Sequence, residues 1–243
     1  MTHQLPVLDD ILPGLAKAKI FGRADLSHGY WHCTLEEDSS MFTTFSSPFG
    51  RYRWTRLPFG LSISSEIFKK RLVQALEGIV GVACIADDIL IYGIGDTLDE
   101  ARQDQDKNLS LLLECCRQKS IKLNRDKVVL RVQQVDFMGH LLTAQGLKPD
   151  SNKVEAILKL ETPGTKEKIE RQNGTVNYLA KFLPRLSQVM DPLRRLTQTG
   201  VEWYWGNAEE KAFDEVKQLS LKLQFLPTTA QTRNLSYSAM PVA

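Results

Sequence analysis

Residues 79–92 read IVGVACIADDILIY, two apolar runs interrupted only by Asp87 and Asp88. This pattern predicts a buried hairpin with carboxylates at its tip. Removing a carboxylate from water is costly unless the group is paired, solvated or bound to metal. Because adjacent strand residues point to opposite faces, both acids can serve one site only if the tip is a tight turn; otherwise one binds metal and its neighbour is auxiliary. The alternative is an exposed Asp-Asp turn without a function.

Asp25 is the candidate third carboxylate, because it ends a predicted strand over residues 20–24 that could pair with the hairpin. Oxygen ligands without His or Cys favour Mg²⁺ or Mn²⁺. Two such ions about 4 Å apart would activate an attacking hydroxyl and neutralise the leaving oxygen of an in-line phosphoryl displacement.

The elements around these acids change in type along the chain. Apolar spacing predicts helices over 5–15, 64–78 and 98–119, and strands over 20–26, 29–35, 41–45, 52–57 and 128–132, with another hairpin over 135–148. From residue 150 the period is helical, over 151–160, 166–174, 176–183, 188–196 and from 207, with a strand-like stretch at 201–205. We therefore expect an α+β unit over 1–145, a helical unit over 146–200 and a linking region with a divergent tail over 201–243.

The composition excludes several classes of protein. The chain has 243 residues, a formal net charge of +2, 42% hydrophobic and 25% charged residues, which is ordinary for a globular protein and excludes a disordered tail protein.

The longest stretch without Asp, Glu, Lys or Arg, residues 39–50, is too short to cross a bilayer. We also find no secretory signal, and therefore expect an intracellular protein, in the cytoplasm or the nucleus, with no membrane partner. The four cysteines lack the spacing of a disulfide framework or a zinc site.

The charges are unevenly distributed. Residues 109–200 carry 16 basic and 9 acidic side chains, whereas residues 61–108 carry 5 and 9. A basic region beside an acidic one suits a protein that holds a nucleic acid backbone in one place and divalent metal in another. Solvated helix faces would produce the same distribution.

A series of motifs around the acids carries a resemblance. They are, in order, Leu5-Pro6-x-x-Asp9-Asp10-Ile11-Leu12, Phe21-x-x-x-Asp25-Leu26-x-x-Gly29-Tyr30, Leu57-Pro58-Phe59-Gly60-Leu61, Ala86-Asp87-Asp88-Ile89-Leu90-Ile91-Tyr92, Lys122-Leu123-Asn124 and Phe137-Met138-Gly139-His140. Together they resemble the reverse transcriptases of gypsy-type long-terminal-repeat retrotransposons, and the resemblance covers about 220 residues, through Trp203 to Phe213.

The resemblance implies an α+β fold, a right-hand polymerase palm with an antiparallel sheet, followed by a helical thumb and part of a connection region. It also implies an RNA-directed DNA polymerase that uses Mg²⁺ or Mn²⁺, a primed RNA or DNA template and deoxynucleoside triphosphates. Ribonuclease H and integrase domains of the same polyprotein would be further partners.

The resemblance further implies roles for individual residues. Asp25, Asp87 and Asp88 match the catalytic, metal-binding carboxylates, and Tyr30 matches the aromatic gate under the incoming sugar; a core aromatic is the alternative for Tyr30. The loop Leu57, Pro58, Phe59 and Gly60 matches the wall of the nucleotide site, with a plain Pro-Gly turn as the alternative. Phe137, Met138, Gly139 and His140 match the hairpin that seats the primer terminus, although a Phe and a Met on a strand can be simple core. Lys122 and Lys127 would contact template and primer.

Three departures from the family pattern lower the expected activity. Ile85 stands where many relatives have Tyr, and Gln172 where they carry an apolar thumb residue. The family's fingers region, whose Lys and Arg hold the triphosphate, would lie before Leu5, and each such cation is typically worth about 10² to 10³ in rate. We therefore expect weak or no activity from the chain alone. The alternatives are a non-catalytic remnant that binds template-primer and a decayed element that folds poorly.

Overall fold

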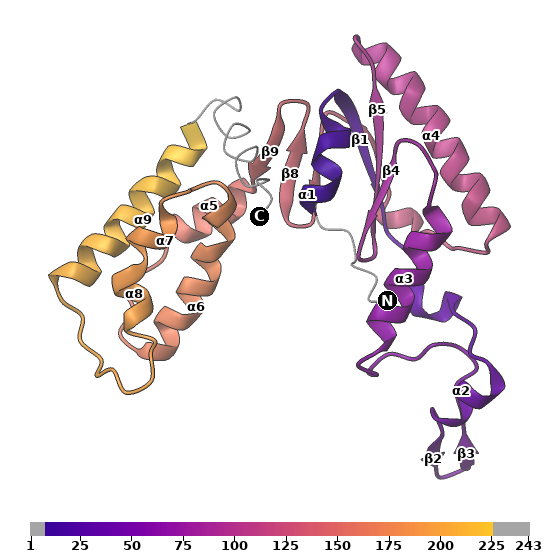
Figure 1. Ribbon diagram of the computed structural model, residues 1–243, viewed down its shortest axis with the longest axis horizontal. Helices are drawn as coiled ribbons and strands as arrows, with labels where there is room; N and C mark the ends of the chain where they lie inside the picture. The colour runs from indigo at the N-terminus through magenta and orange to yellow at the C-terminus, as the bar shows by residue number, and fades with distance from the viewer. Residues whose placement is uncertain (1–7, 226–243) are drawn as a thin grey trace, which may run out of the picture. The chain divides into compact units, whose positions relative to one another are not determined.

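The computed structural model describes residues 8–225 and divides into two compact units (Figure 1). The first contains the described residues up to Met138 together with Leu142–Ala144, and the second contains Gly139–Leu141 and the described residues from Gln145. The two units interleave over residues 139–144, and the domain divisions expected at residues 145 and 200 stay predictions.

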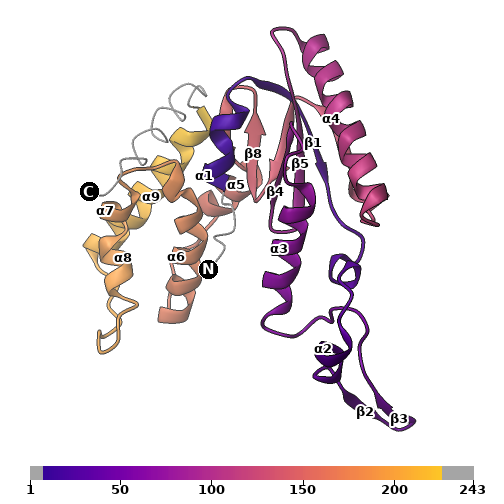
Figure 2. The same cartoon turned by 45° about the vertical axis from the view of Figure 1, so that its right-hand side comes forward.

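The first unit is built on a four-stranded sheet in the order β4 (Val82–Ile85), β5 (Asp88–Ile94), β1 (Ala18–Ala24) and β6 (Val129–Val132) (Figure 2). All neighbouring strands are antiparallel. The pairing of β1 with β5 is the one that the positions of the acids required. Strand β5 is central, and after Asp88 it reads as an apolar run in which Ile89, Leu90 and Ile91 are fully buried.

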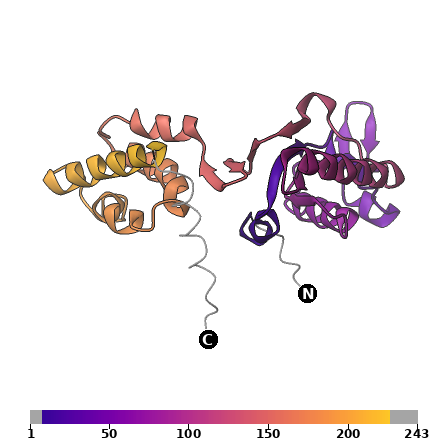
Figure 3. The same cartoon turned by 90° about the horizontal axis from the view of Figure 1, so that it is seen from above.

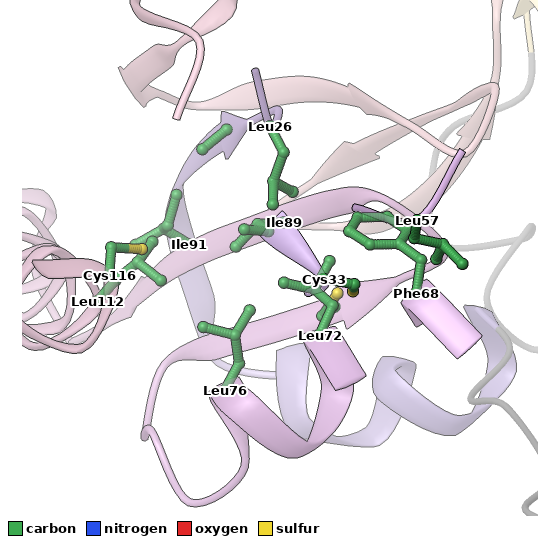
Figure 4. Packing of buried hydrophobic residues seen from close by; sticks show 12 residues of the cluster. Leu26, Cys33, Leu57, Phe68, Leu72, Leu76, Ile89, Ile91, Leu112 and Cys116 are labelled. Atoms are coloured by element: carbon green, nitrogen blue, oxygen red, sulfur yellow. The ribbon is translucent and has the colours of Figure 1, made fainter. Parts of the chain in front are cut away.

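Two long helices, α3 (Ser64–Leu76) and α4 (Leu98–Gln118), pack on one face of this sheet (Figure 3). Their residues Leu72, Leu76, Leu112 and Cys116 form one cluster with Ile89 and Ile91, which alternate onto the same face of β5 (Figure 4). Helix α4 begins at a capping box, in which Thr97 accepts the Glu100 N–H and Glu100 accepts the Thr97 N–H. The helix approaches β5 so closely that a Cβ on Gly93 would lie 1.9 Å from the Ala101 carbonyl oxygen.

Short elements complete the first unit: α1 (Leu8–Ile11), η1 (Leu12–Leu15), η2 (Gly29–His32), α2 (Glu37–Met41), β2 (Phe45–Ser47), β3 (Gly50–Tyr52) and η3 (Arg125–Lys127). The strand expected over 29–35 is wrong, because residues 29–32 form a 3-10 helix that begins after His28 in the left-handed conformation (φ 55°). The strand expected over 41–45 is also wrong. There, Ser40 donates to the Trp54 carbonyl and Thr43 to the Ser40 carbonyl, and such side-chain bonds favour turns over strand ladders.

A second sheet has the order β7 (Gln134–Phe137), β8 (His140–Thr143) and β9 (Gly146–Pro149). The helices that follow in the second unit are α5 (Ser151–Leu158), α6 (Lys166–Asn177), η4 (Tyr178–Lys181), α7 (Leu186–Val189), α8 (Asp191–Arg195) and α9 (Asn207–Phe225). The strand expected over 201–205 is wrong, because these residues form no strand. Their aromatic rings pack together instead: the Trp205 ring centroid lies 6.2 Å from that of Trp203 and 5.8 Å from that of Phe213. Within residues 8–225, no helix has both the length and the apolar character needed to span a bilayer.

Candidate functional site

The register of the central strands brings the predicted carboxylates to one end of the sheet. Ala24 pairs with Ile89, so Asp25 follows β1 at the end where Asp88 begins β5. Ile85 pairs with Asp88, which leaves Ala86 and Asp87 as a two-residue loop, with Ala86 at φ 58°. The tip is therefore the tight turn that two cooperating acids require.

A pocket of about 270 Å³ opens at this end of the sheet, and its lining includes Asp25, Asp87, Tyr30, Phe59 and Lys127. These residues are far apart in the sequence and come from the ends of β1 and η3, the β4–β5 loop, η2 and the loop before α3. Asp88 is not part of the lining. Two of the three predicted carboxylates thus face one cavity together with the predicted aromatic gate.

Two charged residues of this pocket form an ion pair. The Lys127 Nζ lies 2.6 Å from the Asp25 Oδ2, and the Asp25 Oδ1 accepts the Leu26 N–H at 2.7 Å. The hydrogen bond and the charge of Asp25 raise the pKa of Lys127. Lys127 therefore remains a cation in contact with a carboxylate of the site.

Asp88 has a different environment from Asp25. Burial raises the pKa of the Asp88 carboxyl, and the negative charges of Asp87 and Asp25 raise it further, while Arg23 opposes the shift. The sequence analysis did not identify Arg23. Its position in the predicted strand, two residues before Asp25, could have indicated a positive charge near the carboxylates.

The carboxylates suit a hard cation in chemical type. Among residues 8–225, no group of three His, Cys, Asp or Glu side chains has the geometry of a metal site. Mg²⁺, however, is commonly held by one or two carboxylates together with substrate phosphates and water. Asp25 and Asp87 fit that smaller ligand set, with Asp88 adjacent to it.

The predicted gate, Tyr30, and the predicted wall loop, residues 57–60, differ in how far their side chains are buried. The Tyr30 hydroxyl lies 2.7 Å from the Ser65 Oγ, and its ring meets the edge of Phe59 at 4.7 Å between centroids. Leu57 and Pro58 are buried, whereas Phe59 is exposed and Gly60 has the positive φ of 89° that a glycine turn provides. Phe59 is thus the side chain of this loop that reaches the pocket.

The predicted primer hairpin has a two-residue turn, Met138-Gly139, with φ values of 51° and 75°. Phe137 is fully buried, and His140 is buried with its ring stacked 5.1 Å from that of Tyr178. Met138 is the large side chain that the turn exposes. A role in seating a primer stays a prediction for all four residues.

The two predicted lysines lie in different places. Lys127 lines the carboxylate pocket, whereas Lys122 lines a separate pocket with Trp31 and Trp54. Lys69 of α3 also lines the carboxylate pocket, although no motif identified it.

An antiparallel sheet with Asp87 at the turn of its central hairpin, facing a pocket that Tyr30 and Phe59 also line, is the arrangement expected of a polymerase palm. Residues 1–142 match the family described as Reverse transcriptase (RNA-dependent DNA polymerase), and the chain belongs to this family.

The curated relatives are polyproteins much longer than this chain. The chain is 32% identical over 215 residues to the retrovirus-related Pol polyprotein from transposon 412 of Drosophila melanogaster, covering 88% of this chain and 17% of that protein. It is 28% identical over 218 residues to the enzymatic polyprotein of cauliflower mosaic virus (strain Strasbourg), covering 89% of this chain and 31% of that protein. The chain thus corresponds to the reverse transcriptase region of retroelement polyproteins.

Solved structures share the fold. The foamy viral protease-reverse transcriptase dRH in complex with double-stranded DNA matches with a TM-score of 0.78 and 25% identity, over 90% of this chain and 38% of that one. The foamy viral protease-reverse transcriptase in complex with an RNA/DNA hybrid matches with a TM-score of 0.77 and 24% identity, over 91% of this chain and 30% of that one. The α+β palm fold expected from the sequence is confirmed.

Proposed function

We propose that this chain is the RNA-directed DNA polymerase region of a gypsy-type retrotransposon polyprotein, and that it adds deoxynucleotides to a primer 3′-hydroxyl on an RNA or DNA template. The observation that carries the proposal is the shared pocket of Asp25, Asp87, Tyr30 and Phe59 at the end of the sheet. The solved relatives bound to nucleic acid support such partners. Ribonuclease H and integrase domains would accompany it in the polyprotein.

Mg²⁺ or Mn²⁺ would be held by Asp25 and Asp87, with Asp88 beside them. Such an ion supplies charge neutralisation and lowers the pKa of a bound hydroxyl group. The chain's own residues contribute positioning. Tyr30, anchored by the hydroxyl of Ser65, presents a ring where the sugar of an incoming nucleotide would lie, and Phe59 braces that ring. Lys69, which also lines the pocket, supplies positive charge for phosphate groups.

Primer extension on an RNA template with Mg²⁺ or Mn²⁺ tests this proposal. Asp25→Asn and Asp87→Asn should each lower incorporation by about 10² to 10³, the usual effect of losing a group that stabilises transition-state charge. Asp99→Asn, on the exposed first turn of α4, is the matched control and should leave incorporation unchanged. Incorporation that survives both Asp25→Asn and Asp87→Asn would remove the assigned roles.

A second candidate is a non-catalytic module that binds template-primer. The Lys127–Asp25 ion pair favours it, because a cationic side chain already occupies one carboxylate of the site. We accordingly propose weak or no incorporation by this chain alone. Salt-dependent binding of template-primer without incorporation, in the presence of either metal, would favour this candidate.

We also propose an intracellular location, in the cytoplasm or the nucleus. The four cysteines Cys33, Cys84, Cys115 and Cys116 are free thiols, as expected in a reducing compartment.

A further inference from the structure

A second pocket in the first unit has a composition unlike that of the carboxylate site. It has a volume of about 620 Å³, which is in the range of small-molecule sites, and its lining includes His28, Trp31, His32, Trp54, Arg56 and Lys122. No Asp or Glu of the described residues lines it. The pocket therefore combines flat apolar rings with positive charge.

Two backbone pairings hold the walls of this pocket. On one side, the Leu35 N–H donates to the Thr55 carbonyl at 3.0 Å and the Leu57 N–H to the Cys33 carbonyl at 2.9 Å, which fixes the strand-like segment that carries Trp54 and Arg56. On the other side, the Ser27 N–H donates to the Lys122 carbonyl at 2.9 Å. The walls are thus set by main-chain bonds between segments distant in sequence.

The aromatic side chains remain available to a ligand. Trp31 is 42% exposed and Trp54 is 41% exposed, although most large aromatic side chains are expected to be mainly buried. One contact of Trp31 is with His28, whose ring stacks on it at 4.9 Å between centroids. An exposed indole on a fixed backbone is a platform on which a nucleobase can stack.

The charges in the pocket are also available. Arg56 donates to the Thr34 hydroxyl at 2.7 Å, and within residues 8–225 neither Arg56 nor Lys122 forms an ion pair with a carboxylate. Burial lowers the pKa of His32, and the positive charges of Lys122, Arg56 and His28 lower it further. The pocket thus has a positive potential that would attract phosphate groups.

We propose that this tryptophan pocket binds an unpaired nucleotide of a single-stranded nucleic acid, with the base on Trp31 or Trp54 and the flanking phosphates at Arg56 and Lys122. Its position supports this occupant, because His28 lines both this pocket and the carboxylate pocket. A strand that passes the carboxylates can therefore continue into the tryptophan pocket. The inference extends the proposed function but does not require catalysis.

The test measures the affinity of the full chain for a fluorescein-labelled dT12 oligonucleotide and for an abasic 12-mer with the same backbone. Trp31→Leu should weaken dT12 binding by about 10-fold, as expected for one lost base stack, and should leave binding of the abasic strand unchanged. Arg56→Gln should weaken both strands and reduce the slope of log K against log salt concentration by about 0.7. Trp54→Leu serves as the second ring variant if Trp31→Leu does not fold.

Lys107→Gln, on the exposed surface of α4, is the matched charge control. An unchanged dT12 affinity in both ring variants, or an equal loss for the abasic strand, would overturn the inference. Primer extension by the original chain, Asp25→Asn and Asp87→Asn, measured beside dT12 binding, separates the two proposals. If dT12 binding depends on Trp31 while Asp25→Asn and Asp87→Asn extend primers as well as the original chain, the tryptophan pocket stands and the assigned polymerase roles fail. If primers are extended while both ring variants bind dT12 normally, the reverse holds.

Discussion

The Nζ of Lys127 lies 2.6 Å from the Oδ2 of Asp25, so a cation of the chain itself occupies the carboxylate that ends β1. A divalent ion at Asp25 would have to displace this ammonium group or share the carboxylate with it. The two cations repel each other at such a distance. Lys127 therefore competes with metal for the site.

Replacing Lys127 with Met should tighten Mn²⁺ binding to the chain by a few-fold, because the competing charge is removed. The measurement is a titration of free Mn²⁺ by electron paramagnetic resonance. Lys127→Arg preserves the positive charge and should behave like the original chain. Weaker Mn²⁺ binding in Lys127→Met would show that Lys127 supports the metal site and does not compete with it.

The Tyr30 ring should determine which sugars enter the carboxylate pocket. Tyr30→Val removes the ring that lies between Phe59 and Phe68, and should raise ribonucleotide incorporation relative to deoxynucleotide incorporation by roughly 10- to 100-fold. Tyr30→Phe loses the contact with Ser65 but retains the ring, so its selectivity should stay close to the original. Equal selectivity in all three chains would exclude a gate at this position.

The sequence predicted the central features because they depend on local patterns. The apolar runs on both sides of Asp87 and the helical spacing of Leu112 and Cys116 correspond to β4, β5 and α4, whose packing is buried and regular. The strand prediction for residues 29–35 was wrong. Their alternation of residue types resembles that of a strand, but His28 adopts the left-handed conformation and the chain continues as a 3-10 helix.

The ion pair of Lys127 with Asp25 could not be predicted, because it joins residues 102 positions apart and depends on where η3 lies beside the end of β1. The tryptophan pocket was missed for the same reason. Trp31, Trp54 and Lys122 come from three segments that only the backbone pairings bring together. Motif spacing identifies residues within one segment, and carries little information on such long-range contacts.

The burial of Asp88 should make the stability of the chain depend on pH in a defined direction. Its pKa in the folded chain is raised, so the folded state binds more protons than the unfolded state as pH rises above the ordinary Asp value of about 3.9. Stability from this group is therefore lost with rising pH. Asn does not titrate, so Asp88→Asn should lack this loss. Its free energy of unfolding, measured with urea, should therefore increase relative to that of the original chain as the pH is raised from acidic to neutral.

Glu100 provides a control of opposite sign for the Asp88 measurement. The backbone N–H groups of Thr97 and Asp96 lower its pKa, so its contribution is present above the ordinary Glu value and is lost as pH falls. Glu100→Gln should therefore lose stability at neutral pH relative to acidic pH. A stability difference for Asp88→Asn that does not vary with pH would contradict the burial of a charged carboxyl at this position.

Ala86 sits at φ 58° in the loop that carries Asp87, a conformation that costs a residue with a Cβ about 1 kcal/mol. Ala86→Gly should therefore raise the free energy of unfolding by about 0.5 to 1 kcal/mol. Ala83→Gly in β4 makes the same chemical change on an extended strand, and should lower it by a similar amount. Destabilisation by both variants would argue against the left-handed turn.

Gln172 of α6 is a buried polar residue whose hydrogen bonds are half satisfied. Its Nε2 donates to the Glu161 carbonyl at 2.8 Å, but its Oε1 is buried without a hydrogen-bond partner among the described residues. An unpaired buried oxygen costs about 1 to 3 kcal/mol, and replacing Gln172 with Leu removes it. The Glu161 carbonyl would lose its donor, but Glu161 is exposed, so water can replace that donor. Gln172→Leu should therefore raise the free energy of unfolding by about 1 kcal/mol.

Thermal and urea unfolding of Gln172→Leu and Gln172→Glu distinguish the causes of that change. Gln172→Glu keeps the size of the side chain, removes its donor and adds a buried charge, so it should be strongly destabilised at neutral pH and less so in acid. If Gln172→Leu is instead less stable than the original chain, the bond to Glu161 outweighs the unpaired oxygen. The glutamine would then be a supporting residue of α6, and its departure from the family's apolar pattern would not mark decay.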